Sequence, residues 1–266
     1  MDHCTWEMTV SIKYPRQTKK TNEDFFKRKN QELTNLDWAK WAGWFDTDGW
    51  FRRNKKNQGR SARLYLKDRQ PVELFSKTFE TSLTSREHKT ITPEPYRYKY
   101  TTTEHMVVLS GEKAVWFTKN VFPYLIKEEK KDFAEKLLGY RPESKDFTTW
   151  TDDETVYYLA TVIEGDGSFS IWGKKNSCIA TLISSSDKQY LASIQSLSKN
   201  KLGITSTLFV RPRRYKKEIK TKYGVRINGS LRNSNNLGFF KNLVKDNVMT
   251  LDRKKQKVQK FVTCVS

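Results

Sequence analysis

Two segments of this chain repeat each other, and this repeat constrains the possible fold more than any other feature. One reads WAGWFDTDGWF at 41–51 and the other LATVIEGDGSFS at 159–170, so Gly167 lies 118 positions after Gly49. Each is typical of an apolar helix that ends in acid–small–Asp–Gly and continues into an alternating strand. Such a duplication predicts two similar units related by an approximate two-fold axis.

The segments after each motif also follow one common order of predicted elements. Asp187 has the character of an N-cap, and Pro71 suits the first turn of a helix. In the first half we expect a strand at 62–67 and helices at 72–79, 115–125 and 130–138. In the second half we expect strands at 179–183, 207–213 and 224–228, and helices at 189–197, 237–244 and 253–261.

The predicted fold class is therefore α+β, a pseudo-two-fold tandem repeat of helix–strand–strand–helix–strand–strand–helix. Antiparallel sheets would lie on one side and helices on the opposite face. We expect an N-terminal half at 1–140, a polar linker at 141–153, and a C-terminal half at 154–266.

Positive charge is spread over both halves. Lys and Arg number 50 against 30 Asp and Glu, a net charge of +20. Residues 1–140 hold 27 basic and 19 acidic residues, and residues 141–266 hold 23 and 11. A charge of this size favours a polyanionic partner, which is DNA, RNA or, less often, an acidic membrane surface; a highly charged, soluble surface is the less favoured alternative.

Cysteine and histidine usage excludes several classes. Cys4, Cys178 and Cys264 are isolated, which argues against a disulfide framework or a zinc ribbon and favours an intracellular, reducing compartment. The three histidines form no metal-spaced cluster. No apolar run approaches the roughly 20 residues that span a bilayer, so no membrane association is expected.

The two motif helices bring a pair of acids to one place. Small residues four positions apart, Gly43 with Thr47 and Thr161 with Gly165, would let the helix backbones approach closely. Asp48 and Asp166 would then meet at adjacent helix ends, where they repel each other unless a divalent cation such as Mg²⁺ binds between them. One Asp-Gly is ordinary turn chemistry, but two in matching frames favour a metal site.

These residues resemble the two motifs of single-chain LAGLIDADG homing endonucleases, and the resemblance extends over nearly the whole chain. It implies site-specific, metal-dependent double-strand cleavage of DNA, with Asp48 and Asp166 as catalytic metal ligands. Mg²⁺ is the expected cofactor and Mn²⁺ a substitute, whereas Ca²⁺ should bind without supporting cleavage. The family also uses a basic residue before the last helix of each half, and the candidates are Lys130 and Lys254; a solvated helix face explains these two lysines equally well.

Strand alternation sorts the sheet residues into a core face and an outward face. Phe169 and Ile171, Leu64 and Leu66, and Leu208 and Val210 are assigned to the core. The outward set is rich in side chains suited to phosphates and base edges, on strands that fit the major groove. The predicted DNA-binding residues are Arg52, Asn54, Lys56, Arg63, Tyr65, Lys67, Arg97, Lys99, Ser170, Trp172, Lys174, Arg211, Arg213, Arg226 and Asn228.

Two other functions remain open at this level. One is an intron maturase on the same scaffold, which would bind host intron RNA with or without cleaving DNA. The other is a transcription regulator that binds DNA without cutting it. The presence of both acids favours cleavage. We further expect a monomer that binds double-stranded DNA, and the richness in Lys and Asn is compatible with an AT-rich mitochondrial or chloroplast genome.

Overall fold

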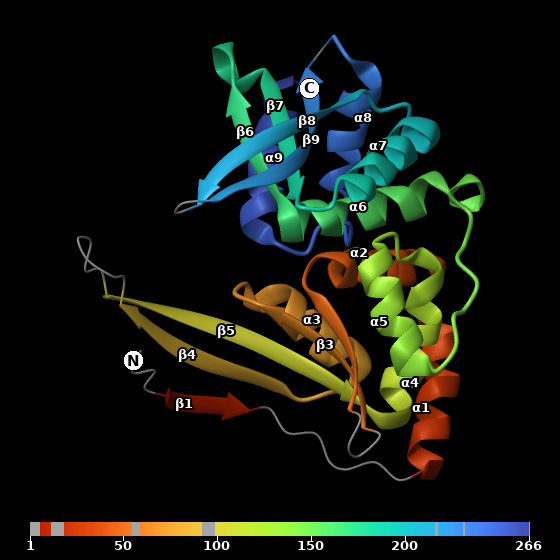
Figure 1. The fold of residues 1–266 in the computed structure, drawn as a ribbon. Coiled ribbons are helices and arrows are strands. Elements are labelled where there is room, and N and C mark those ends of the chain that lie inside the picture. Colours follow the sequence, from red (N-terminus) through yellow and green to blue (C-terminus); the bar gives the residue numbers. More distant parts are fainter. Residues whose placement is uncertain are drawn as a thin grey trace.

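The computed structural model describes residues 6–11, 19–54, 59–91, 99–215, 218–230 and 232–265. The two halves form separate sheets that meet through a pair of central helices, α2 and α6 (Figure 1). The predicted α+β tandem repeat is confirmed. Among the described residues, no helix is both long and apolar enough to cross a membrane.

The first half carries a five-stranded antiparallel sheet in the order β1-β4-β5-β3-β2. Its strands are β1 (Trp6–Ser11), β2 (Gly49–Arg53), β3 (Arg60–Leu66), β4 (Leu83–Ile91) and β5 (Lys99–Ser110). Its helices are α1 (Lys19–Glu32), α2 (Asn35–Thr47), α3 (Arg69–Phe79), α4 (Gly111–Val121), η1 (Phe122–Tyr124) and α5 (Glu128–Leu138). Strand β1 and helix α1 precede the repeated unit and were not predicted.

The second half carries a four-stranded antiparallel sheet in the order β6-β7-β9-β8. This order matches β2-β3-β5-β4, so the two sheets repeat each other strand for strand. The strands are β6 (Gly167–Trp172), β7 (Cys178–Ser185), β8 (Ser206–Tyr215) and β9 (Glu218–Ser230). The helical segments are η2 (Phe147–Thr149), α6 (Asp152–Asp166), η3 (Lys174–Asn176), α7 (Lys188–Leu202), α8 (Ser234–Leu243) and α9 (Asp252–Val265).

Local signals explain where the helices begin and end. Helix α6 starts in a capping box, in which Thr151 N donates to Glu154 Oε2 (2.7 Å) and Glu154 N donates to Thr151 Oγ1 (3.1 Å). Asp187 caps α7 as expected, because its carboxylate accepts from Tyr190 N at 2.9 Å. Helix α7 ends at Gly203, whose φ of 61° is left-handed and favours glycine.

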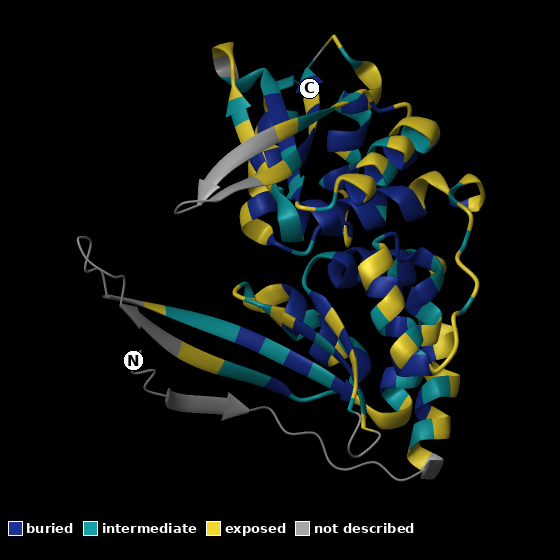
Figure 2. Cartoon of the chain, viewed as in Figure 1, coloured by how far each residue is buried: buried dark blue, intermediate teal, exposed yellow. Residues whose placement is uncertain are grey.

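The core of the first half is strongly aromatic. Phe75, Phe79 and Phe117 are fully buried, and Trp41 packs edge-on against Phe75 with ring centroids 5.0 Å apart. Trp44 is also fully buried. Trp41 and Trp44 of the first motif are therefore core residues, whereas Trp50 is exposed. Helices α2 and α6 are buried along most of their length (Figure 2).

One predicted core residue is wrong. Val210 was assigned to the core face of its strand, but its side chain is 59% exposed. It pairs with Tyr223 in the β8–β9 hairpin, and Figure 1 shows this hairpin extending beyond the helices that cover the sheet. The alternation is correct, but at this position no helix covers the face.

Candidate active site and nucleic-acid interface

The site is built on the crossing of α2 and α6, which lie against each other along their small residues. A Cβ placed on Gly43 would lie 2.1 Å from Thr161 Oγ1, and one placed on Gly165 would lie 2.4 Å from Thr47 Oγ1. Both distances are shorter than real contacts allow, so the two backbones approach as closely as glycine permits. Thr161 Oγ1 also donates to the carbonyl of Lys40 at 3.0 Å, which links the helices directly.

This crossing places Asp48 and Asp166 together. Asp48 is the C-cap residue of α2, and Asp166 is the last residue of α6. Burial raises the pKa of Asp48 to about 6, and the negative charge of Asp166 adds to the shift. Burial also raises the pKa of Asp166, although the charges of Lys127 and Lys130 oppose this change. Each acid is thus held where its ionised form lacks water, which is the situation that a cation relieves.

The first acid of each motif has a different role. Asp46 Oδ2 accepts from Ile126 N at 2.8 Å and from the Tyr158 hydroxyl at 2.5 Å. Glu164 Oε1 accepts from Thr250 N at 2.6 Å and from Leu251 N. Both acids are buried and hold the loop that leads into the last helix of their half. They therefore position the elements that carry Lys130 and Lys254.

Those two lysines occupy matching positions. Lys130 Nζ donates to the carbonyl of Gly49 at 2.6 Å, and Lys254 Nζ donates to the carbonyl of Gly167 at 2.7 Å. Lys254 Nζ also donates to the carbonyls of Ile163 and Glu164. Burial, reinforced by the charge of Arg253, lowers the pKa of Lys254 to about 8. Both side chains are buried, and each one binds the backbone where a motif helix ends.

The donor set around the acids fits a hard divalent cation. Asp48 Oδ2 is buried and makes no hydrogen bond with the described residues. In the part of the chain that the structure describes, no group of three or more His, Cys, Asp and Glu side chains could hold a metal by itself. A cation here would complete its shell with water and a bound phosphate, as Mg²⁺ commonly does.

A small cavity of about 310 Å³ opens beside Asp48, and of its two basic residues the sequence predicted Lys67, as a DNA contact, but not Arg253. Its lining includes Lys67 from the first half and Arg253 from the second. Arg253 directly precedes Lys254, the residue chosen from the sequence. The run DRKK at 252–255 indicated a basic residue near the site, but the sequence does not show which of its side chains faces the cavity. That depends on how α9 is rotated about its own axis.

The predicted outward residues lie largely where strand alternation placed them. In the first half, Arg52 and Tyr65 are exposed and Arg63 is half-buried. In the second half, Ser170, Trp172, Arg226 and Asn228 are exposed. The register pairs Trp50 with Arg63, and Arg52 with Ser61, on one face of the first sheet. Each half thus presents a polar, partly basic strand surface.

Other predicted contact residues lie past the ends of strands. Asn54 follows β2 and Lys67 follows β3. Lys174 is exposed but lies in η3, because Gly173, with φ of 88°, ends β6 before it. Lys99 lies in β5, and Arg211 and Arg213 lie in β8 opposite Lys222 and Lys220. Lys56 and Arg97 lie outside the described residues.

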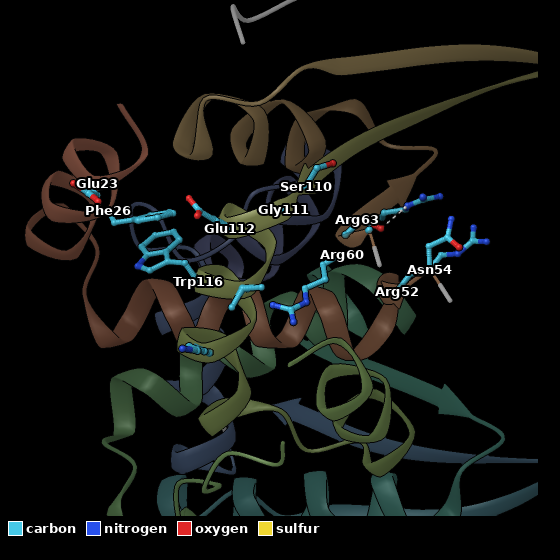
Figure 3. Close-up of a pocket in the computed structure, with 14 residues that line it drawn as sticks. Glu23, Phe26, Arg52, Asn54, Arg60, Arg63, Ser110, Gly111, Glu112 and Trp116 are labelled. Carbon is cyan, nitrogen blue, oxygen red and sulfur yellow. Dashed lines mark hydrogen bonds between the residues drawn. The ribbon is translucent and has the colours of Figure 1, made fainter. Parts of the chain in front are cut away.

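A groove of about 830 Å³ continues from the outward residues of the first sheet to helices α1 and α4. Figure 3 shows Arg52, Asn54 and Arg63 at one end of this groove and Phe26 with Trp116 at the other. Phe26 stacks on Trp116 with ring centroids 5.4 Å apart. The polar surface of the first sheet is thereby extended beyond its strands.

Comparison with known proteins agrees with this geometry. A family model described as a LAGLIDADG-like domain matches twice, at residues 35–121 and 153–240. A comparison with curated proteins gives no significant match. Among solved structures, the homing endonuclease I-WcaI bound to its DNA recognition sequence is 13% identical and matches with a TM-score of 0.50, covering 92% of this chain and 94% of that one. The N-terminal LAGLIDADG domain of DUF199/WhiA is 12% identical with a TM-score of 0.38, covering 92% and 99%.

Proposed function

Because this chain belongs to the LAGLIDADG family, with two family domains on one polypeptide, we propose that it is a homing endonuclease. In this proposal it makes metal-dependent double-strand breaks at a long DNA target. One of the solved structures that this chain resembles is the homing endonuclease I-WcaI bound to its DNA recognition sequence. Its likeness supports the scaffold, and the function is argued from the residues of this chain.

The observation that carries the proposal is the pair of buried acids at the helix crossing. Asp48 and Asp166 lie at adjacent helix ends of a chain whose net charge is +20. A protein that only bound DNA would gain nothing from two mutually repelling carboxylates at the centre of a basic molecule. A nuclease needs such a pair, because carboxylates can hold a cation against a phosphate.

Asp48 and Asp166 would hold the cation, and Mg²⁺ is the ion that their oxygen atoms suit best, with Mn²⁺ as a substitute. When bound, the cation would stabilise the negative charge that develops on the phosphate as the phosphodiester bond breaks. The unpartnered Oδ2 of Asp48 supports this role, since a buried carboxylate oxygen without a hydrogen bond is costly.

The remaining residues of the site orient these acids. Asp46 and Glu164 hold the loops, and Lys130 and Lys254 tie the last helices to the glycines that follow the catalytic acids. Rigid placement matters because an error of about 1 Å in a reacting group can cost about 10²-fold in rate. The outward strand residues would position the duplex by phosphate contacts and read base edges.

The test begins by selecting a cleavable target from a randomised DNA library and placing it in a supercoiled plasmid. Wild type should linearise the plasmid in Mg²⁺ and leave it intact in Ca²⁺. Asp48→Asn and Asp166→Asn should each give only nicked plasmid or none cut, and the double variant should be inactive. Asp246→Asn is the matched control, because this acid is fully exposed.

Folding and binding must survive in these variants if the acids act in chemistry. Both single variants should keep the melting temperature of wild type or exceed it slightly, since a repelling buried charge is removed, and they should bind the target in Ca²⁺. If both linearise the plasmid at the wild-type rate, the two-acid mechanism fails. Binding of intron RNA without any cleavage of DNA would instead favour a maturase.

A further inference from the structure

The two halves of the site differ in their basic side chains. Lys67 and Arg253 line the cavity beside Asp48. Lys254 cannot serve there, because an ammonium group has three hydrogens and Lys254 Nζ already donates to three backbone carbonyls. The α9 cation that lines this cavity is Arg253, whose side chain is 60% exposed.

Arg253, in the second half, forms an ion pair with Asp68, in the first half. Its Nε donates to Asp68 Oδ1 at 2.9 Å and its Nη2 donates to Asp68 Oδ2 at 2.5 Å. This paired geometry is the one a guanidinium uses to bind a phosphate. The Asp68 carboxylate thus occupies the position that a phosphate oxygen pair would take.

Among the residues that the structure describes, the other half of the site shows no such pair. The matching bonds of Lys130 and Lys254 make Glu129 the counterpart of Arg253, and the matching strand registers make Ser186 the counterpart of Lys67. Asp187 stands at the N-cap position of α7 as Asp68 does in α3, but its carboxylate accepts from Tyr190 N, whereas the Asp68 carboxylate makes no capping bond. Lys127 Nζ lies 5.6 Å from the centroid of the Tyr190 ring.

We propose that Arg253 binds a DNA phosphate in the Asp48 half of the site, and that Asp68 occupies its guanidinium until DNA enters. The inference rests on the proposed function. Its consequence is that the two DNA strands are cut at unequal rates, because the described residues place a phosphate-binding arginine in the Asp48 half and none at the matching position, Glu129, of the other half.

The experiment measures the cleavage rate of each strand separately, with saturating enzyme and a target duplex labelled differently on its two strands. Arg253→Gln should slow one strand about tenfold or more, since a hydrogen bond to a charged group is worth about 1.5–3 kcal/mol, and should leave the other within about twofold. Arg253→Lys should fall between, because it keeps the charge and loses the paired geometry. Glu129→Gln is the control at the matching position.

Asp68→Asn separates phosphate binding from a structural clamp. If Asp68 competes with phosphate, its replacement should speed the Arg253-dependent strand about two- to fivefold relative to the other, as expected for release of an exposed ion pair. If the pair only holds the halves together, Asp68→Asn and Arg253→Gln should lower the melting temperature alike and slow both strands alike, which would overturn the inference. A wild-type protein that cuts neither strand would overturn the proposed function and this inference together.

Discussion

The backbones of α2 and α6 approach each other closely where the helices cross, and Gly43→Ala tests this directly. A Cβ at this position would lie 2.1 Å from Thr161 Oγ1 and 2.6 Å from the carbonyl oxygen of Tyr158. Thr161 cannot move aside at no cost, because its hydroxyl bonds to the carbonyl of Lys40 at 3.0 Å. The helices must therefore separate.

Overpacking of this kind costs about 1–3 kcal/mol, and alanine returns up to about 1 kcal/mol through its higher helix propensity. The net loss should be about 1–2 kcal/mol, or a fall in melting temperature of roughly 2–8 °C for a chain of this size. Cleavage should fall further than stability, since a shift of about 1 Å between Asp48 and Asp166 can cost about 10²-fold in rate.

Thermal melting followed by circular dichroism measures the first effect, and the single-turnover cleavage rate measures the second. Gly238→Ala is the matched control, because this glycine lies in α8 and a Cβ there would meet nothing within 4 Å. It should raise the melting temperature, by an amount that reflects about 1 kcal/mol of helix propensity. If Gly43→Ala is as stabilising as Gly238→Ala, the close helix crossing is wrong.

Four further predictions follow from the charge, the duplication and the buried groups. Affinity for the target duplex should drop about 10³–10⁵-fold between 50 and 200 mM salt if about six to ten phosphates are neutralised; a flat response would contradict the basic interface. Light scattering should give a monomer of 31.4 kDa with and without DNA, and a dimer would contradict the internal pseudo-dimer. Burial raises the pKa of Asp48 to about 6 and that of Glu164 to about 7. The protonated carboxyls therefore stabilise the fold fully below their ordinary pKa values of 3.8 and 4.5, and this stabilisation is lost as pH rises through 6 to 7. The melting temperature should fall as the pH rises over this window, and it should fall less in Glu164→Gln. Lys254→Met removes the donor of three backbone carbonyls and should cost about 3 kcal/mol in urea unfolding; a loss below about 1 kcal/mol would show that the lysine is dispensable for folding.

The helices and strands of the repeat could be predicted because their signals are local. The motif helices carry apolar residues at helical spacing, and Asp187 caps α7 as expected, although α7 continues to Leu202, past the expected end at 197. The duplication helped further, because a weak pattern in one half could be checked against the other. The additional strand β1 had no counterpart in the repeat, so nothing in the sequence distinguished it from a tail.

The side-chain roles were less predictable than the elements. Lys130 and Lys254 were found from their position before the last helix, yet their bonds to backbone carbonyls depend on where α5 and α9 pack. Asp46 and Glu164 each precede a catalytic acid by two positions, and only the packed loops show that their carboxylates accept from backbone N–H groups.

The sequence by itself determined the tandem architecture, the two acids at equivalent helix ends and the basic character of both halves, because periodicity, spacing and charge are properties of the chain. The tertiary structure alone decided which lysines are buried, that Val210 is exposed, and that Arg253 meets Asp68 across the seam. These outcomes depend on contacts between residues that lie far apart in the chain, 185 positions in the case of Arg253 and Asp68. Such contacts produce no local sequence pattern from which they could be predicted.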